Sequence, residues 1–324
     1  MKIEPITIKK SFKKTKILVI GDLMLDKYSF GNSSRQSPEA PVPIIDEFNE
    51  DVFLGGAANT ALNIKMLGSG KVSCCGVIGK DNSGKMIKNL IKKSNINYKG
   101  IVVDNSHKTT TKKRIYLNDK QMLRLDNEQN EISYKSQSLI KKFLKEEINN
   151  YNLIVISDYN KGVVTKTLVA EIKRLCKKNK ISIIVDPKQN FSVYKGVDYI
   201  TPNFKEFRKN SELKKNKLSE IFLTGRKIIN KHKIKNILVT LGEKGMILID
   251  DRSKNYIKTQ KVKNADVVGA GDTVIAALSL CIASNLEKIL SIQISNIAAK
   301  ISVSKSATST VSFDEIEDDI INLL

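Results

Sequence analysis

Near the C-terminal end of the chain, a run of small residues leads into an apolar stretch. The run is Asp266-Val-Val-Gly269-Ala270-Gly271-Asp272-Thr273, and the apolar stretch covers residues 274–283. Small residues at the start of a helix leave its first N–H groups uncovered, and these groups together with the helix dipole attract phosphate oxygens. We therefore interpret Gly269, Ala270 and Gly271 as an anion hole.

Asp272 follows that hole directly, where it would stand beside a transferring phosphoryl group. A carboxylate at a helix N-terminus is a weak base. Phosphoryl transfer nevertheless passes through a loose transition state, so a positioned weak base suffices to take the proton of the attacking hydroxyl. We expect Asp272 to be that base. The alternative interpretation is an aspartate that only caps the helix behind a glycine turn.

Alternating apolar and amphipathic stretches indicate the elements that would position this turn. Such alternation is typical of a mostly parallel sheet with helices on both faces, so the predicted fold class is α/β, a three-layer α/β/α sandwich. Strands are expected at residues 17–20, 72–78, 153–156, 181–185, 199–200, 237–239 and 246–249, and helices at 56–67, 83–93, 138–148, 166–178 and 218–230.

Residues 28–54 and 98–128 interrupt this alternation with short strands and proline-containing turns. We expect them to pair into a small second sheet that forms a lid. Both segments would be inserted in one domain over residues 16–324, and residues 1–15 would form an N-terminal extension.

Polar residues follow most of the expected strands. In an open parallel sheet, ligands bind outside the carboxyl ends of the strands, so this clustering favours a site there over simple helix caps. The residues are Asp22, Asp26, Asp158, Asp186, Lys188, Asn203, Glu206, Gly242, Asp266 and Asp272.

The composition limits the classes of function. With 324 residues, 41% of them hydrophobic, the chain can bury a full core. No apolar run approaches the roughly 18 residues of a membrane span, so we expect a cytoplasmic protein that does not act at a membrane. Four cysteines without a C-x-x-C pair indicate reduced core residues. His107 and His232 stand in polar stretches and are expected at the surface, which disfavours a histidine-based site.

A net charge of +21 raises the question of nucleic-acid binding. The lysines are spread over nearly every expected helix instead of forming one patch, so we interpret them as solvated surface and expect no nucleic-acid partner.

Two further patterns resemble nucleotide-binding loops only in part. The stretch Gly79-Lys-Asp-Asn-Ser-Gly-Lys-Met86 is close to a P-loop, but Met86 replaces the hydroxyl that would bind magnesium. The run that begins at Gly269 starts as a dinucleotide fingerprint does, but it lacks the third glycine and comes late in the chain. A hydride-transferring enzyme therefore fits poorly.

Taken together, the motifs resemble those of the ribokinase or PfkB family of carbohydrate kinases, from about Lys16 to the C-terminus. The matching stretches are Gly55-Gly-Ala-Ala-Asn59, Gly79-Lys-Asp-Asn-Ser-Gly84, Asp186-Pro-Lys188, Pro202-Asn-Phe-Lys-Glu206, Val239-Thr-Leu-Gly-Glu-Lys-Gly245 and Gly269-Ala-Gly-Asp272. The resemblance implies a ribokinase-like fold, an ATP-dependent activity and a requirement for Mg²⁺.

The resemblance also implies roles for individual residues. Asp272 would be the base and Gly269, Ala270 and Gly271 the anion hole. Asn203 and Glu206 would organise magnesium indirectly, through the triphosphate. Asp266 would hold a monovalent cation such as K⁺; here Val267-Val268 replaces the usual threonine pair and Ala307 replaces a glycine near the nucleotide. The remaining nucleotide-binding residues would be Phe204, Lys205, Gly242 and Asn296, and the sugar-binding residues Asp26, Gly55, Gly56 and Asn59.

Within the family the chain most resembles the heptose-7-phosphate kinases of lipopolysaccharide and ADP-heptose synthesis. The stretches that carry this resemblance include residues 21–28, 34–43, 124–126, 157–162 and 308–312. It implies a sugar substrate that already carries a phosphate, with Arg124, Lys161 and Lys188 as its ligands; Lys112 and Arg114 are further candidates. The chain ends at Leu324 without the H-x-G-H motif of a nucleotidyltransferase domain, so it resembles the stand-alone form.

Three expectations stay open from the sequence. The first is an alternative substrate: a family member with this lid that acts on another sugar or sugar phosphate. A basic nucleic-acid-binding protein on a kinase scaffold is the rival from another class. An exposed lid edge would favour a homodimer.

Overall fold

The first strand shows why the chain folds into three layers. In the computed structural model, which describes residues 4–118, 120–213, 215–263, 265–305 and 308–323, β1 (Lys16–Gly21) is buried on both faces. Ile17 and Val19 point into one apolar core, and Leu18 and Ile20 point into a second core on the opposite face. Because successive side chains of a strand alternate in direction, a continuous apolar strand needs helices on both sides.

The main sheet has nine strands in the order β13-β12-β11-β10-β9-β8-β1-β4-β5. Pairing is parallel from β11 to β5, while β12 and β13 are antiparallel. Its strands after β1 are β4 (Lys71–Gly79), β5 (Asn97–Asp104), β8 (Leu153–Ser157), β9 (Ser182–Asp186), β10 (Tyr199–Ile200), β11 (Asn236–Thr240), β12 (Met246–Ile249) and β13 (Lys254–Ile257).

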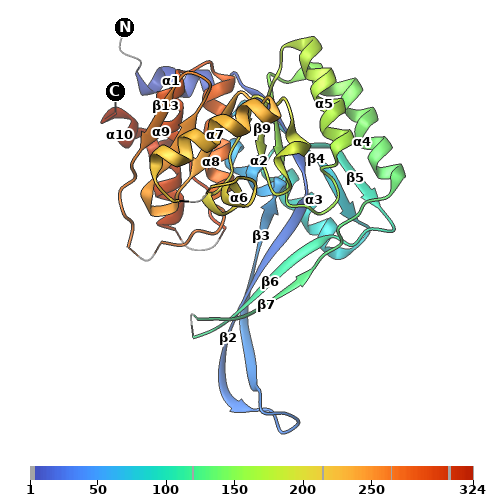
Figure 1. Cartoon of the computed structure of the whole chain (residues 1–324). Helices are drawn as coiled ribbons and strands as arrows, with labels where there is room; N and C mark the ends of the chain where they lie inside the picture. The colour runs from blue at the N-terminus through green and yellow to red at the C-terminus, as the bar shows by residue number, and fades with distance from the viewer. Residues whose placement is uncertain (1–3, 119, 214, 264, 306–307, 324) are drawn as a thin grey trace.

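Helices cover both faces of this sheet (Figure 1). One core includes buried residues of α1 (Pro5–Phe12), α2 (Ala57–Met66), α3 (Asn82–Lys93), α8 (Ala270–Ala283), α9 (Lys288–Val303) and α10 (Phe313–Ile321). The other includes α4 (Tyr134–Glu147), α5 (Lys166–Asn179), α6 (Phe204–Lys209) and α7 (Leu218–His232). The expected α/β sandwich is confirmed, with helix and strand ends within a few residues of the predicted ones. Among the described residues, no helix is both long and apolar enough to cross a bilayer.

A second sheet has the order β3-β2-β6-β7 and extends away from the main body (Figure 1). Its strands are β2 (Leu23–Gln36), β3 (Pro43–Gly56), β6 (Thr110–Leu117) and β7 (Lys120–Asn127). We call this sheet the lid. The second segment expected in the lid, residues 98–128, contributes less to it than predicted. The first part of that segment is in β5, which completes a β4–α3–β5 crossover and pairs with β4 in the main sheet.

The segment expected as an N-terminal extension packs against the body through Ile8 and Phe12, which are both buried. The expected surface position of His107 and His232 is wrong, because both are buried, at 7% and 9% exposure. The Nδ1 atom of His107 lies 3.2 Å from the carbonyl of Glu131, a contact between segments that sequence patterns do not reveal.

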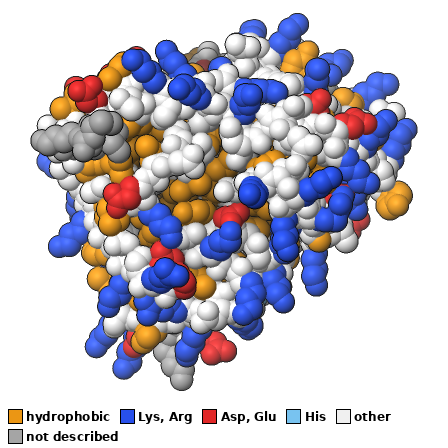
Figure 2. Space-filling model, turned by 90° about the horizontal axis from the view of Figure 1, so that it is seen from above, with side chains coloured by type: hydrophobic (Ala, Val, Ile, Leu, Met, Phe, Trp, Pro, Cys, Tyr) orange, Lys and Arg blue, Asp and Glu red, His pale blue; other side chains and the backbone are white. Residues whose placement is uncertain are grey.

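On the face seen in Figure 2, basic side chains do not form a single stripe. Figure 2 shows Lys and Arg spread across the visible face, with acidic and uncharged residues between them. This spread is the one inferred from the sequence.

Candidate active site

Asp272 lies in the first turn of α8 and is almost fully buried, at 4% exposure. Three side chains donate hydrogen bonds to its carboxylate. Thr60 Oγ1 lies 2.7 Å and the Tyr159 hydroxyl 3.0 Å from Oδ1, and Asn59 Nδ2 lies 2.7 Å from Oδ2. Burial raises the pKa of Asp272, and these three donors oppose that rise. Donors that favour the charged form keep a carboxylate available as a base inside an apolar site.

The orientation of Asn59 is fixed by a chain of side-chain hydrogen bonds. The hydroxyl of Thr273 donates to Asn63 Oδ1 at 3.1 Å, and Asn63 Nδ2 donates to Asn59 Oδ1 at 3.1 Å. The amide nitrogen of Asn59 is therefore the atom that faces Asp272. Asn59, expected to bind the sugar, holds the expected base in this structure.

Tyr159 reaches Asp272 from the loop after β8. The buried carboxylate of Asp22 anchors this loop by accepting the backbone N–H groups of Tyr159, Lys161 and Val163 at 2.8 to 3.1 Å. Burial and the charge of Asp272 raise the pKa of Tyr159 well above its usual value, so its hydroxyl stays protonated and donates.

The N-terminus of α8 is open, as the small residues predicted. Gly269 caps the helix with a left-handed φ of 77°, and no side chain caps the first turn. A Cβ at Gly271 would meet nothing within 4 Å. The first N–H groups of the helix are thus accessible to an anion.

A cavity of about 680 Å³ begins at this helix N-terminus. The expected anion-hole residues Ala270 and Gly271 contribute to its wall. So do the expected nucleotide-binding residues Asn203, Phe204, Lys205, Gly242 and Asn296. Its volume is in the range of small-molecule and cofactor sites.

Asn203 and Glu206 form a capping box at the start of α6. Each side chain accepts the other residue's backbone N–H at 2.9 Å. The second carboxylate oxygen of Glu206 lies 2.5 Å from Lys188 Nζ. Both Glu206 oxygens therefore already have a protein partner.

These residues fit magnesium held through water and phosphate. The described residues contain no cluster of three or more His, Cys, Asp or Glu that could hold a metal directly. Magnesium commonly keeps several waters and uses one or two carboxylates with substrate phosphates. Burial and the nearby charges of Glu206 and Asp272 raise the pKa of Asp186 well above its usual value. A cation here would relieve that concentration of negative charge.

Asp26 and the glycine pair meet at the base of the lid. Asp26 forms a buried ion pair with Arg114 at 2.7 Å. A Cβ at Gly55 would lie 2.4 Å from Asp26 Oδ2, and Gly56 has a φ of 56°. Both glycines are therefore required by the local geometry.

Most of the basic residues expected to bind a sugar phosphate already have acidic partners. Arg124 binds Asp126 at 2.8 Å, Lys161 binds Glu128 and Lys188 binds Glu206. Among the described residues, Lys112 differs because no carboxylate lies within 4.0 Å of its ammonium. Its Nζ atom lies instead 5.7 Å from the centre of the Tyr159 ring, and burial lowers its pKa.

Asp266 precedes the anion-hole turn. Its Oδ1 accepts the backbone N–H of Val268 at 3.0 Å, and its own N–H donates to Val303. Ala307, the other position where the sequence departs from the family pattern, lies outside the described residues.

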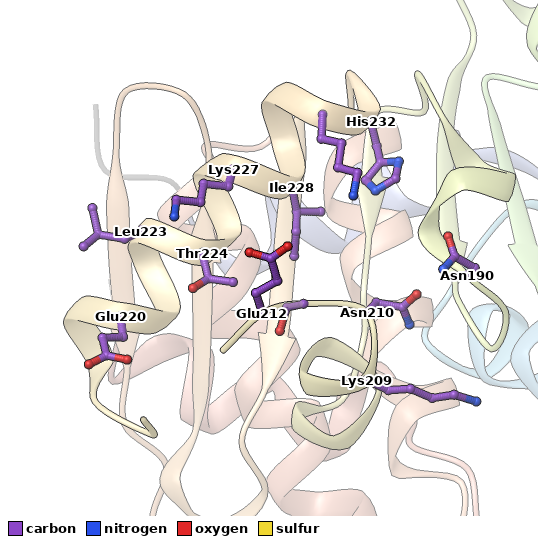
Figure 3. Close-up of a pocket in the computed structure, with 12 residues that line it drawn as sticks. Asn190, Lys209, Asn210, Glu212, Glu220, Leu223, Thr224, Lys227, Ile228 and His232 are labelled. Atoms are coloured by element: carbon purple, nitrogen blue, oxygen red, sulfur yellow. The ribbon is translucent and has the colours of Figure 1, made fainter. Parts of the chain in front are cut away.

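A second hollow of about 740 Å³ lies between α7 and the segment after α6 (Figure 3). None of the expected site residues lines it. Its wall contains the acidic residues Glu212 and Glu220 and the basic residues Lys209 and Lys227, so its charges are mixed.

Sequence reasoning did not assign roles to Thr60 and Tyr159. Thr60 directly follows Asn59, and one helix start can present both side chains to the same partner. Tyr159 lies in the stretch Ser157–Gly162, which carries part of the resemblance to heptose-7-phosphate kinases but no chemical motif of its own.

The sequence pattern of the pfkB family of carbohydrate kinases matches residues 14–315. The chain belongs to this family. The comparisons thus confirm the expected family of carbohydrate kinases.

Two curated relatives of this pfkB kinase are named bifunctional protein HldE. The protein from Sulfurimonas denitrificans is 40% identical over 316 residues, which cover 96% of this chain and 65% of that protein. The one from Haemophilus influenzae is 38% identical over 311 residues, covering 95% and 64%. The chain therefore spans slightly less than two thirds of the length of these relatives.

Solved structures share the fold at lower identity. Escherichia coli phosphofructokinase-2 in complex with potassium superimposes with a TM-score of 0.79 at 20% identity, covering 95% of this chain and 99% of that chain. Arabidopsis thaliana ribokinase complexed with ribose and ATP gives 0.71 at 16% identity, covering 95% and 98%. The ribokinase-like fold with a smaller second sheet is confirmed.

Proposed function

We propose that this kinase transfers the γ-phosphoryl group of ATP to the anomeric hydroxyl of D-glycero-β-D-manno-heptose 7-phosphate, giving the 1,7-bisphosphate. The observation that carries the proposal is the buried carboxylate of Asp272, held by three donors at the helix N-terminus that opens into the 680 Å³ cavity. The choice of sugar is supported by the resemblance of residues 34–43 and 157–162 to heptose-7-phosphate kinases.

In the proposed reaction, Asp272 takes the proton of the sugar hydroxyl as its oxygen attacks the γ-phosphorus. The bond from that phosphorus to the β-phosphate breaks, and ADP leaves with the electron pair. The open N–H groups of α8 hold the phosphate oxygens, and Asp26, Gly55 and Gly56 bind the sugar.

Magnesium, when bound, would neutralise part of the triphosphate charge. Glu206 and Asn203 would hold its waters, and Asp186 would add negative charge nearby. Asp266, with backbone carbonyls beside it, would bind a monovalent cation such as K⁺. Chelation with EDTA should abolish turnover, and excess Mg²⁺ should restore it.

For the phosphate of the sugar we propose Lys112 together with Arg124, with Lys161 and Lys188 in support. Lys112 requires no ion pair to be broken before it binds, whereas Arg124 already shares two of its five N–H donors with Asp126. Remote phosphate binding can position the reacting hydroxyl, so its loss should lower kcat/KM.

The lid also provides a surface for a homodimer. Every residue of the edge strand β7 is exposed, including Met122 and Leu125 at 51% and 55%. An exposed edge with apolar side chains favours pairing with a second copy.

The test is ATP consumption with a panel of sugar phosphates, including heptose 7-phosphate, free heptose and hexose phosphates, at fixed Mg²⁺ and salt. We expect heptose 7-phosphate to give the highest kcat/KM. Removal of its phosphate, or Lys112→Ala, should cost about 2–4 kcal/mol of transition-state binding. A higher kcat/KM with another sugar would identify that sugar as the substrate. Equal values for the free and phosphorylated heptose would rule out the phosphate pocket.

A further inference from the structure

The two oxygens of the Asp272 carboxylate are unequally occupied. Oδ1 accepts two hydrogen bonds, from Thr60 at 2.7 Å and from Tyr159 at 3.0 Å. Oδ2 accepts one, from Asn59 at 2.7 Å. A carboxylate offers about four lone-pair sites, two on each oxygen. Among the described residues, the donors therefore fill Oδ1 and leave one site on Oδ2.

We propose that Tyr159 is a positioning residue of phosphoryl transfer: with Thr60 it occupies Oδ1, so that Oδ2 receives the proton of the sugar hydroxyl. This inference rests on the proposed role of Asp272 as the base. The proton passes from the sugar oxygen to Oδ2, the sugar oxygen bonds to the γ-phosphorus, and the leaving electron pair stays on ADP.

The position of Tyr159 is fixed independently of Asp272. Its backbone N–H donates to Asp22, and Asn160, which follows with a left-handed φ of 57°, donates its backbone N–H to Asp158 at 2.7 Å. The loop is thus held by the carboxylate of Asp22, which follows β1, and by that of Asp158, which follows β8. A hydroxyl held in this way can orient a base before the substrate arrives.

The ring of Tyr159 also lies near two lysines, one from the lid and one that follows a strand of the main sheet. Lys112 Nζ, from the lid, lies 5.7 Å from the ring centre, and Lys188 Nζ, after β9, lies 5.9 Å from it. These cation–ring contacts involve the ring and not the hydroxyl. Tyr159→Phe therefore keeps them and removes only the hydrogen bond to Asp272.

The test compares Tyr159→Phe with wild type in kcat, in KM for both substrates and in the pH dependence of kcat. We expect kcat to fall about 10-fold to 100-fold, the usual effect of one hydrogen bond to a charged group. The KM values should change little. Because the lost donor favours the charged form, the pKa of Asp272 should rise and the acid limb of the profile should move to higher pH.

The matched control is Tyr151→Phe. The Tyr151 hydroxyl bonds to Ser73 at 2.8 Å, and both residues are buried. They lie near the N-terminal ends of β8 and β4, whereas Tyr159 follows the C-terminal end of β8. This variant should leave kcat and the acid limb unchanged. An unchanged kcat and acid limb in folded Tyr159→Phe would overturn the inference.

A second pair of variants serves if Tyr159→Phe fails to fold. Thr60→Val removes the other donor to Oδ1, and Thr60→Ser keeps it. Thr60→Val should lower kcat and move the acid limb, and Thr60→Ser should restore both. Equal behaviour of the two variants would contradict the inference. Near-normal turnover of Asp272→Asn would instead contradict the proposed base, which separates the two failures.

Discussion

The side-chain amide of Asn59 lies 2.7 Å from the carboxylate of Asp272, although 213 residues separate them in the chain. Asn59 belongs to the first turn of α2, which begins directly after lid strand β3, and Asp272 to the first turn of α8. The two helix starts therefore bring the base of the lid and the expected anion hole to one point. Any closure of the lid over a substrate would therefore take place beside Asp272, the proposed catalytic base.

Asn59→Asp should place a second carboxylate against Asp272. Like charges at this distance cannot both ionise easily, so the pKa of the pair should rise. We expect kcat at neutral pH to fall about 10-fold or more and the acid limb of kcat to move to higher pH. A pH–rate profile checks this, and a profile identical to that of wild type would show that Asn59 does not contact the base during turnover.

Gly271→Ala should weaken ATP binding without lowering the stability of the fold. A Cβ there meets nothing within 4 Å, and alanine suits a helix better than glycine, so stability should stay equal or rise by up to about 1 kcal/mol. The added methyl would occupy the space of the expected phosphate, so KM for ATP should rise. Thermal unfolding and ATP titration measure the two effects.

The control for that variant is Gly225→Ala in α7, where a Cβ would lie 2.3 Å from Ile249 Cδ1. We expect it to lose about 1–3 kcal/mol through overpacking while KM for ATP stays unchanged. If Gly271→Ala left KM for ATP unaltered, the anion hole would lie elsewhere.

Glu206→Gln should raise the Mg²⁺ concentration needed for half-maximal rate. Its matched control is Glu315→Gln, because Glu315 also completes a capping box, with Ser312, and also pairs with a lysine at 2.5 Å. Both variants should lose similar stability, but only Glu206→Gln should change the Mg²⁺ dependence. Equal Mg²⁺ curves for the two variants would return Glu206 to a purely capping role.

Local signals predicted the parts of the site that are local in sequence. The small residues 269–271 indicated an open helix start because helix geometry fixes where the first N–H groups point. The pairing of Arg124 with Asp126 was not predicted, although Asp126 lies two residues along the same strand and therefore on the same face.

Contacts that depend on the path of a loop could not be predicted. Tyr159 meets Asp272 because Asp22, more than a hundred residues earlier, bonds the backbone of its loop. The burial of His107 depends on a carbonyl of another segment. β5 was assigned to the lid because a short alternating strand looks the same in either sheet, and only the preceding crossover helix decides which sheet it joins.

The most direct test of the central claim is single-turnover phosphoryl transfer by wild type and Asp272→Asn, with ATP binding measured on the same preparations. Asparagine keeps the shape of the side chain and removes the base. We expect the rate to fall about 100-fold or more, while ATP binds with nearly unchanged affinity. A folded Asp272→Asn variant that transfers the phosphoryl group at close to the wild-type rate would contradict the account.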